Sequence, residues 1–333
     1  MLDTAMRESL SRHPLRAPGV LAIFVVCLAL LLSVTISHSD DLVLIKVRVL
    51  VPQSTAALPF LLMARQHSIP GVDLQVDFFL NHAQALALLL RGETDLLLSG
   101  TSQGWENRLD GSPLVMIDTG VWGISSLVGK DASLGSFARL KGKRLALPFP
   151  GSPLDFQSRA LLAFDKLDPD RDLTISYGPF PQSVQRLLAG QLDAVALPEP
   201  LATEVVKKNG LSRLIPYSRA WARLTGGDGG SPQVSLFSTE GFSRDHAQTI
   251  SAIVTAWSEA SRTVTADPSG AASWFSASLD TDQAILEEAA RNTLLEVPSM
   301  AENRARVMAY YQMVAKYLPA GQRPLDEQFF LAH

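Results

Sequence analysis

The sequence predicts an α/β protein built from mostly parallel sheets flanked by helices, and two observations indicate this class. Between residues 45 and 197, short runs of β-branched and leucine residues alternate with helical patterns. The same order of strand, helix, strand, helix and strand also occurs twice, with equivalent residues at a nearly constant offset. Because alternating β and α elements produce parallel strands with right-handed crossovers, the repeat predicts two similar sheets.

Each unit contains strands and helices recognised by their apolar periodicity and by the Gly and Pro residues that end them. In the first unit, we expect strands at 45–51, 74–79 and 95–99 and helices at 57–66 and 83–91. In the second unit, we expect strands at 144–147, 173–177 and 193–197 and helices at 154–167 and 181–189.

A glycine and an aspartate mark the same place in both units. Gly92 and Gly190 each follow a helix, where a residue without a side chain adopts the left-handed conformation without steric cost. Asp95 and Asp193 then open strands whose apolar runs are unbroken, as is typical of parallel strands buried on both faces. Chance similarity between two βα units is the alternative, but five elements in the same order favour a duplication.

The last hundred residues are expected to be mainly helical. Residues from Ile250 to Val264 place apolar side chains on one face of a helix that ends before Pro268. Ser299 and Glu302 have the spacing of a capping box, which predicts the start of the last helix.

Length and composition exclude several classes of protein. The 333 residues, 47% apolar and 19% charged, are enough for about two domains. Lys and Arg number 29 against 33 Asp and Glu, which excludes a strongly basic nucleic-acid-binding protein. The single cysteine, Cys27, excludes a disulfide framework. The spacing of metal ligands is absent from His67, His82 and His246, which are expected at the surface, so no metal is predicted. No G-x-G-x-x-G follows a strand, so no dinucleotide cofactor is predicted either.

Residues 1–39 differ from the rest of the chain. Arg7, Arg12 and Arg16 precede a run of thirteen apolar residues from Val20 to Leu32. A basic start, a short apolar run and small residues after it predict a secretory signal peptide. The alternative is an uncleaved N-terminal anchor, although this run is short for a membrane span. Both interpretations place the remaining chain in the periplasm or another extracytoplasmic space, free or membrane-tethered.

Three segments carry a resemblance to a known family: TGVWGISSLV (119–128), LKGKRLALPFPGSP (140–153) and LLAGQLDAVALPEP (187–200). With the order of elements and the C-terminal helices, they resemble the periplasmic substrate-binding proteins of ABC importers. The branch that they resemble is the nitrate/sulfonate/taurine and thiamine-precursor-like one. The resemblance extends over about residues 44–330 and is specific for fold and general role rather than for the ligand.

The resemblance implies a two-lobed type II periplasmic-binding-protein fold, hinged by two crossings at Val121–Lys130 and Gln233–Ser238. One lobe would contain residues 41–120 and 235–333, and the other residues 125–230. It also implies a monomeric protein without catalytic activity, which holds a small-molecule ligand between the lobes and delivers it to ABC permease subunits in the membrane.

Four turns are expected to line the ligand site, because ligands of open α/β sheets bind beyond the carboxyl ends of the strands. Small hydroxyl and glycine residues there leave backbone N–H groups accessible, and helix N-termini favour an anionic group. The alternative is that these residues only cap helices and form turns. The residues expected to contact ligand are Gln53, Ser54, Thr55, Ser99, Gly100, Thr101, Ser102, Gly151, Ser152 and Glu199.

Three of the expected site residues have a second interpretation that the sequence leaves open. Thr119 and Trp122 stand at the first crossing, where the indole could stack on a planar ligand or pack the hinge. Glu199 could accept a hydrogen bond from an amine or a ring N–H, or it could cap the helix that follows.

The sequence also offers two alternatives to a free binding protein. Gly100-x-Ser102-x-Gly104 follows a strand, as the nucleophile of an α/β-hydrolase does. However, the only later histidines, His246 and His333, are poorly placed for a triad, so a binding protein is favoured over an exported serine hydrolase. The other alternative is a membrane-anchored solute sensor.

Two classes of ligand are implied, an organic anion such as a sulfonate and an N-heterocycle. The four turns contain no Arg or Lys, which argues against nitrate or sulfate, because dedicated anion sites commonly use these side chains.

Overall fold

The computed structural model of this protein describes residues 44–227, 230–317 and 323–331. The predicted signal peptide or anchor at residues 1–39 lies outside them. Leu44–His333 forms one compact unit. Within its described part, no helix combines the length and the apolar composition needed to cross a membrane.

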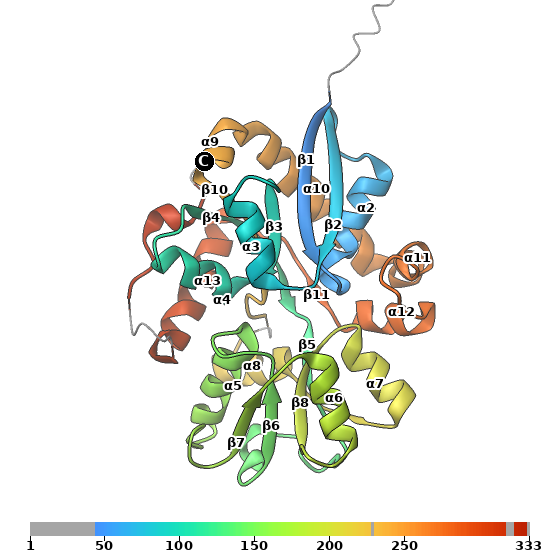
Figure 1. Cartoon of the computed structure of the whole chain (residues 1–333), viewed down its shortest axis with the longest axis vertical. Coiled ribbons are helices and arrows are strands. Elements are labelled where there is room, and N and C mark those ends of the chain that lie inside the picture. Colours follow the sequence, from blue (N-terminus) through green and yellow to red (C-terminus); the bar gives the residue numbers. More distant parts are fainter. Residues whose placement is uncertain (1–43, 228–229, 318–322, 332–333) are drawn as a thin grey trace, which may run out of the picture. The chain divides into compact units, whose positions relative to one another are not determined.

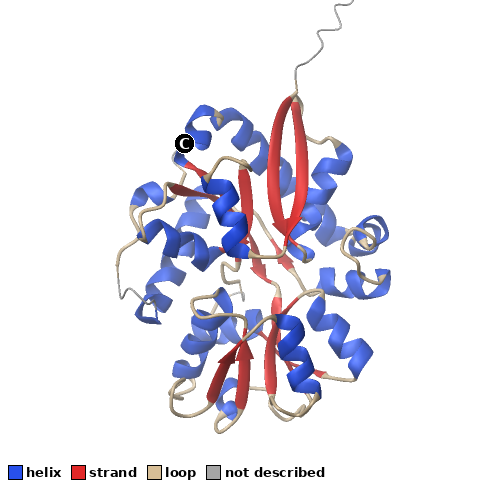
Figure 2. Ribbon diagram, viewed as in Figure 1, coloured by secondary structure: helices blue, strands red, loops and turns tan. Residues whose placement is uncertain are grey.

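The first lobe contains a six-stranded sheet (Figures 1 and 2). Its order is β11-β4-β10-β3-β1-β2, in which β1, β2, β3 and β4 run in one direction and β10 and β11 run against them. The strand bounds are β1 (Ile45–Pro52), β2 (Val72–Phe79), β3 (Leu96–Gly100), β4 (Leu114–Gly123), β10 (Val234–Thr239) and β11 (Leu294–Leu295).

Helices cover this sheet on both faces. Their bounds are η1 (Thr55–Ala57), α2 (Leu58–Gln66), α3 (His82–Leu90), α4 (Thr101–Leu109), α9 (Glu240–Asp245), α10 (Ala247–Ala266), α11 (Pro268–Phe275), α12 (Gln283–Arg291), α13 (Met300–Val314), η3 (Ala315–Tyr317) and η4 (Glu327–Phe329). Ser299 is the N-cap of α13, so the predicted helix start is confirmed. The predicted capping box is wrong, because the Ser299 side chain makes no capping hydrogen bond and Glu302 pairs with Arg306.

The second lobe contains a five-stranded sheet of order β7-β6-β8-β5-β9, in which only β5 is antiparallel to its neighbours. The strands are β5 (Ser125–Gly129), β6 (Arg144–Leu147), β7 (Thr174–Tyr177), β8 (Ala194–Pro198) and β9 (Ser212–Pro216). The helices are η2 (Phe137–Leu140), α5 (Pro153–Phe164), α6 (Phe180–Leu188), α7 (Leu201–Asn209) and α8 (Tyr217–Thr225). Two separate mixed sheets flanked by helices confirm the predicted α/β class, and most strands of each sheet run in one direction.

The repeat predicted from the sequence is present in the structure. The order β3-β1-β2 in the first sheet corresponds to β8-β6-β7 in the second. In both units an arginine of the first strand forms a two-pronged ion pair with the predicted aspartate: Arg48 with Asp95, and Arg144 with Asp193. In each pair the arginine backbone N–H also donates to the aspartate carboxylate, and the arginine carbonyl accepts from the aspartate N–H. The repeat therefore places equivalent turns of the two lobes at equivalent strand ends.

The side chain of Gln233 stabilises the segment that connects the two lobes. Only Ile124 separates β4 from β5, and its N–H donates to the Gln233 side chain at 2.8 Å. The Gln233 amide in turn donates to the side chain of Gln157 on α5 at 2.9 Å. The segment 234–239, expected as part of the return crossing, is β10 and pairs with β3 and β4 in the first sheet.

Aromatic side chains also join the two lobes. Trp105 of α4 lies 6.3 Å from Phe156 of α5, measured between ring centroids, and 5.6 Å from Tyr310 of α13. Trp221 of α8 lies 4.9 Å from the same tyrosine. All four rings are buried, so one core continues from the first lobe into the second.

A buried carboxyl in β4 makes stability depend on pH. Asp118 is 1% exposed, and burial raises its pKa to about 7. Because the folded pKa lies above the unfolded value, ionisation opposes folding, and the free energy of unfolding falls as pH rises from about 4 to about 7. We expect Asp118→Asn to be more stable than the parent by on the order of 1–3 kcal/mol above pH 7. Urea unfolding at about pH 5 and about pH 8 measures this.

The exposed Asp245 supplies the matched control, since Asp245→Asn removes the same charge from the surface. A stability difference between Asp118→Asn and the parent that stays constant from low to high pH contradicts the assignment.

Candidate functional site

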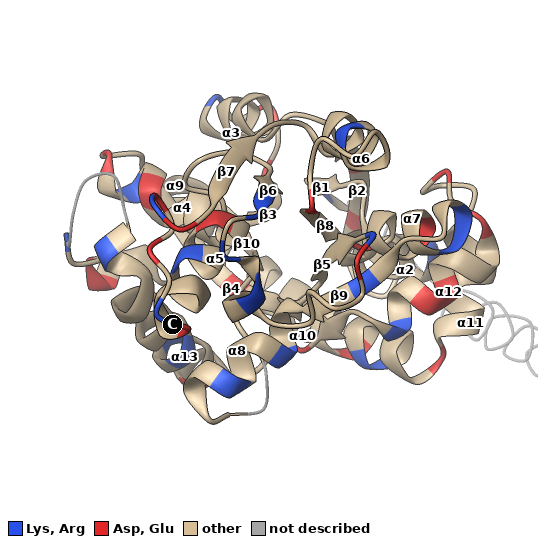
Figure 3. Cartoon of the chain, turned by 90° about the horizontal axis from the view of Figure 1, so that it is seen from below, with Lys and Arg blue, Asp and Glu red and all other residues tan. Residues whose placement is uncertain are grey.

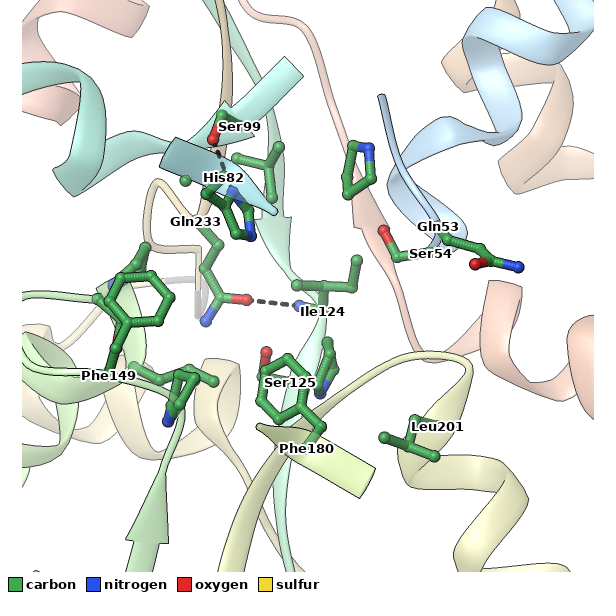
Figure 4. Close-up of a pocket in the computed structure, with 18 of the residues that line it drawn as sticks. Gln53, Ser54, His82, Ser99, Ile124, Ser125, Phe149, Phe180, Leu201 and Gln233 are labelled. Atoms are coloured by element: carbon green, nitrogen blue, oxygen red, sulfur yellow. Dashed lines mark hydrogen bonds between the residues drawn. The ribbon is translucent and has the colours of Figure 1, made fainter. Parts of the chain in front are cut away.

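A cavity of about 850 Å³ lies between the two lobes, at the turns that follow the parallel strands. The first lobe contributes the turns after β1, β2 and β3, and the second lobe contributes those after β6, β7 and β8. Ile124, Ser125 and Gln233 line it from the crossings (Figure 4). We call this cavity the cleft; its position is the one at which sheets of this kind bind ligands.

The wall supplied by the first lobe contains most of the polar side chains of the cleft. Gln53 and Ser54 follow β1, and Ser99 and Gln103 flank the end of β3. His82, the first residue of α3, shares a hydrogen bond of 3.0 Å with the Ser99 hydroxyl. This wall therefore offers several neutral donors and acceptors to a bound molecule.

The wall supplied by the second lobe is mainly apolar. Figure 4 shows Phe149, Phe180 and Leu201 on this side, opposite His82 and Ser99. Many of the remaining lining positions on this side are prolines, namely Pro148, Pro153, Pro179, Pro181, Pro198 and Pro200. The cleft thus has one wall of mixed polarity and one mainly apolar wall.

Prolines and side-chain caps occupy several helix N-termini at the cleft, which differs from the expectation for an anion site, whereas α4, which follows Gly100, has no side-chain cap. Proline occupies N1 of α5 and flanks the starts of α6 and α7, and proline has no N–H. At η1 and α5 the side chains of Ser54 and Ser152 already accept from backbone N–H groups, and at α3 Asn81 does so. Among the described residues lining the cleft there is no Lys or Arg. Figure 3 shows basic and acidic residues interspersed over α7 and α12.

Glu199 is the carboxylate of the cleft wall, and its charge is compensated within the protein. It is 1% exposed, and its Oε1 lies 2.6 Å from a guanidinium nitrogen of Arg213 on β9. Its Oε2 accepts from the Thr203 N–H in the first turn of α7 at 3.0 Å. Burial raises the pKa of Glu199, while the cation and the Thr203 hydrogen bonds act against that shift. Of the two interpretations of Glu199, helix capping is confirmed.

His82 was expected at the surface, and this prediction is wrong. The ring is half-buried in the cleft between Phe79 and Phe149, with centroid distances of 4.8 and 6.0 Å. Burial lowers its pKa to about 4, so the imidazole is neutral at physiological pH. The expectation failed because a lone histidine has no local signal of burial. No metal-binding group of three or more His, Cys, Asp or Glu occurs among the described residues.

The twelve expected site residues divide into two equal groups. The six that line the cleft are Gln53, Ser54, Ser99, Gly100, Ser152 and Glu199. The six that lie outside its lining, each bonded to other parts of the protein, are Thr55, Thr101, Ser102, Thr119, Trp122 and Gly151.

The residues outside the lining have structural partners. The hydroxyl of Thr55 bonds to Thr293 at 2.7 Å, and those of Thr101 and Thr119 both bond to Ser235 at 2.8 Å. The Trp122 indole donates to the Glu296 carbonyl at 2.9 Å and packs under a guanidinium that lies 3.6 Å from its centroid. Trp122 therefore packs the hinge.

Ser102 is fully buried and donates to the Gly151 carbonyl across the two lobes at 2.9 Å. A nucleophilic serine needs a base within hydrogen-bond reach, whereas the partner of Ser102 is a backbone oxygen. The hydrolase arrangement is therefore not formed at this residue, and Ser102 joins the two turns whose neighbouring residues Ser99, Gly100 and Ser152 line the cleft.

Several cleft residues were missed by the sequence analysis, among them Gln103, Phe149, Phe180 and Gln233. The repeat contained a signal for one of them. His82 and Phe180 are the first residues of α3 and α6, at the offset that relates Gly92 to Gly190. Applying the repeat to all turns, rather than to hydroxyl and glycine residues alone, would have identified this pair.

Comparison with known proteins agrees with this architecture. Residues 115–276 match the model of the NMT1-like family. The alkanesulfonate-binding protein SsuA from Xanthomonas axonopodis pv. citri, bound to MOPS, is similar over 85% of this chain and 95% of its own, with 20% identity and a TM-score of 0.65. The fold is that of a type II periplasmic binding protein. The resemblance predicted from the sequence is confirmed at this level.

Three further proteins are similar. The periplasmic nitrate-binding protein NrtA from Synechocystis PCC 6803 matches over 83% of both chains, with 14% identity and a TM-score of 0.66. An ABC transporter protein from Parabacteroides distasonis matches over 87% of this chain and 99% of its own, with 20% identity and a TM-score of 0.71. The nitrate/nitrite binding protein NrtA of Nostoc sp. is 31% identical over 87 residues, which are 26% of this chain and 20% of that relative.

Proposed function

We propose that this protein captures a small organic molecule in the cleft and delivers it to an ABC import permease. The observation that carries the proposal is the cavity of about 850 Å³ formed by equivalent turns of both lobes. A ligand that touches both walls binds the closed arrangement better than an open one, and this difference in affinity drives closure. The protein performs no chemical step in this proposal. A volume of this size suits a drug-sized or smaller molecule.

The lining favours an uncharged or basic organic ligand over a sulfonate. An anion would need cationic side chains or free helix N-terminal donors, and the described lining residues include neither Lys nor Arg. The polar first-lobe wall suits a hydrogen-bonding edge of the ligand, and Phe149, Phe180 and the prolines suit an apolar or planar face. Of the two classes implied by the sequence, an N-heterocycle therefore fits better than an organic anion.

Location and partners follow from the same proposal. The chain is exported by its N-terminal segment and works as a monomer in the periplasm or tethered to the membrane. Its lobes would comprise residues 41–120 with 235–333, and residues 125–230. The structural relatives include proteins named as components of ABC systems, which supports a permease as the partner.

Protein purified without removal of endogenous ligand tests the proposal. We expect denaturation to release one small organic molecule, which mass spectrometry detects. Re-addition of that molecule should raise the melting temperature of the emptied protein. Small-angle scattering should show compaction on binding. A protein that carries no molecule and is stabilised by no solute from a broad panel of heterocycles, amines and sulfonates contradicts the proposal.

Ser102→Ala distinguishes binding from hydrolysis. The substitution removes the hydrogen bond between the lobes, so we expect a loss of about 1 kcal/mol in stability and a larger radius of gyration of the unliganded protein. Hydrolysis of p-nitrophenyl acetate should be unaffected. Ser273→Ala is the matched control, since this exposed serine also donates to a carbonyl, but within one helix. A loss of esterase activity specific to Ser102→Ala would instead support the hydrolase alternative.

A further inference from the structure

A second cavity, of about 410 Å³, adjoins the cleft beneath α3 and α4. The two cavities share part of their lining, so a molecule held in the cleft can extend into the second one. The shared residues are His82, Ala83, Ser99, Gln103 and Phe149. We call the second cavity the side chamber.

The side chamber contains one carboxyl group without a partner. Glu106 lies on α4 one turn after Gln103, and its Oε1 is buried and accepts no hydrogen bond from any described residue. The charged groups that act on it are Asp110 on the same helix and Asp155 on α5, both acidic. Together with burial they raise the pKa of Glu106 to about 7.

The cations near these acids are already engaged. Asp155 is paired with Arg159 at 3.0 Å, and the described residues lining the chamber include no Lys or Arg. The other titratable group among the described residues lining the chamber is His82, which burial keeps neutral. Asn107 also lines the chamber, but its amide donates to the Gln103 carbonyl at 2.7 Å. The Glu106 Oε1 is therefore a hydrogen-bond acceptor that has no donor among the described residues.

The remaining chamber wall suits an apolar stem. It is formed by aliphatic and aromatic side chains, chiefly Leu86, Leu90, Leu97, Leu114 and Phe237. Gly151 lies against the Glu106 carboxyl, since a Cβ there would lie 2.9 Å from its Oε1, and its φ of +80° favours glycine. An apolar passage that ends at a buried carboxylate matches the shape of an arylalkyl amine or an amidine.

We propose that the side chamber is a subsite that binds a protonated amine or amidine group of the ligand through the Glu106 carboxylate. This inference rests on the proposed function, since the ligand enters from the cleft. A charge-assisted hydrogen bond in a site shielded from water is worth about tenfold or more in affinity over a neutral one. The subsite thereby selects basic ligands, for which the cleft itself offers only the Glu199 carboxylate, already paired with Arg213.

Benzylamine and its neutral analogue benzyl alcohol test the subsite, since they differ in the group that would reach Glu106. Ligand-observed NMR titration at about one pH unit above 7 keeps the carboxyl ionised. We expect benzylamine to bind about tenfold more tightly than benzyl alcohol, and Glu106→Gln to abolish that preference. Glu93→Gln is the matched control, since it removes an exposed charge beyond the opposite end of β3 and should leave the preference unchanged.

A second measurement uses the unmodified protein. Protonation of Glu106 below pH 7 should weaken benzylamine binding while benzyl alcohol binding stays constant. Equal binding of both probes, no binding of either at millimolar concentration, or a preference that survives Glu106→Gln overturns the subsite. A co-purified solute whose affinity is unaffected by Glu106→Gln overturns the subsite and leaves the proposed function intact. A protein that binds no solute of any class overturns the proposed function.

Discussion

Arg213→Ala is expected to destabilise the protein by about 3–5 kcal/mol, because it leaves the buried Glu199 carboxylate without its cation. The guanidinium also donates to the hydroxyls of Ser126 and Thr203 at 2.8 and 2.7 Å, so three groups lose a partner at once. Urea unfolding at neutral pH measures the loss. The loss should shrink as pH falls, since protonation of Glu199 removes the uncompensated charge.

Two further variants separate this charge effect from lost packing. Glu199→Gln combined with Arg213→Ala should recover part of the stability, because the double variant contains no buried unpaired charge. Arg291→Ala breaks an exposed pair with Glu287 on one helix and should cost less than about 1 kcal/mol. If the double variant is as unstable as Arg213→Ala at every pH, then packing rather than charge governs this site.

The parts of the fold that the sequence predicted are those determined by local chemistry. Gly92 and Gly190 have φ values of +72° and +73°, as expected of glycines that end helices. The aspartates that follow them lie at the starts of buried strands, where each bonds to an arginine of the neighbouring strand. Backbone conformation and strand burial depend on a few neighbouring residues, so a repeat in the sequence was enough to predict them.

The site was predicted less completely, because side-chain direction depends on packing between distant segments. Ser102 and Gln103 are adjacent on α4, yet Gln103 lines the cleft while Ser102 faces the second lobe. Consecutive helical residues point about 100° apart, so the placement of the second lobe decided which of them faces the cavity. Trp122 was equally undecided, and its position is set by Glu296 and Arg306, which lie far along the chain.

Gly120→Ala is the second substitution with a large expected effect. Gly120 lies in β4, and a Cβ there would overlap the six-membered ring of the Trp257 indole on α10. Trp257 is fully buried and packs against Phe60 at a centroid distance of 5.2 Å, so it has little freedom to move. Overpacking at a constrained core position should cost about 3 kcal/mol, measured as a lower midpoint of urea unfolding.

The cause of that loss is tested by shrinking the ring that meets the new methyl group. Phenylalanine lacks the outer atoms of the indole, so Gly120→Ala with Trp257→Phe should be more stable than the sum of the two single effects predicts. Gly241→Ala is the matched control, since no atom lies within 4 Å of the added Cβ and alanine favours the helix of which Gly241 is part. Strict additivity of the two substitutions would mean that steric overlap with Trp257 is not what excludes a side chain at position 120.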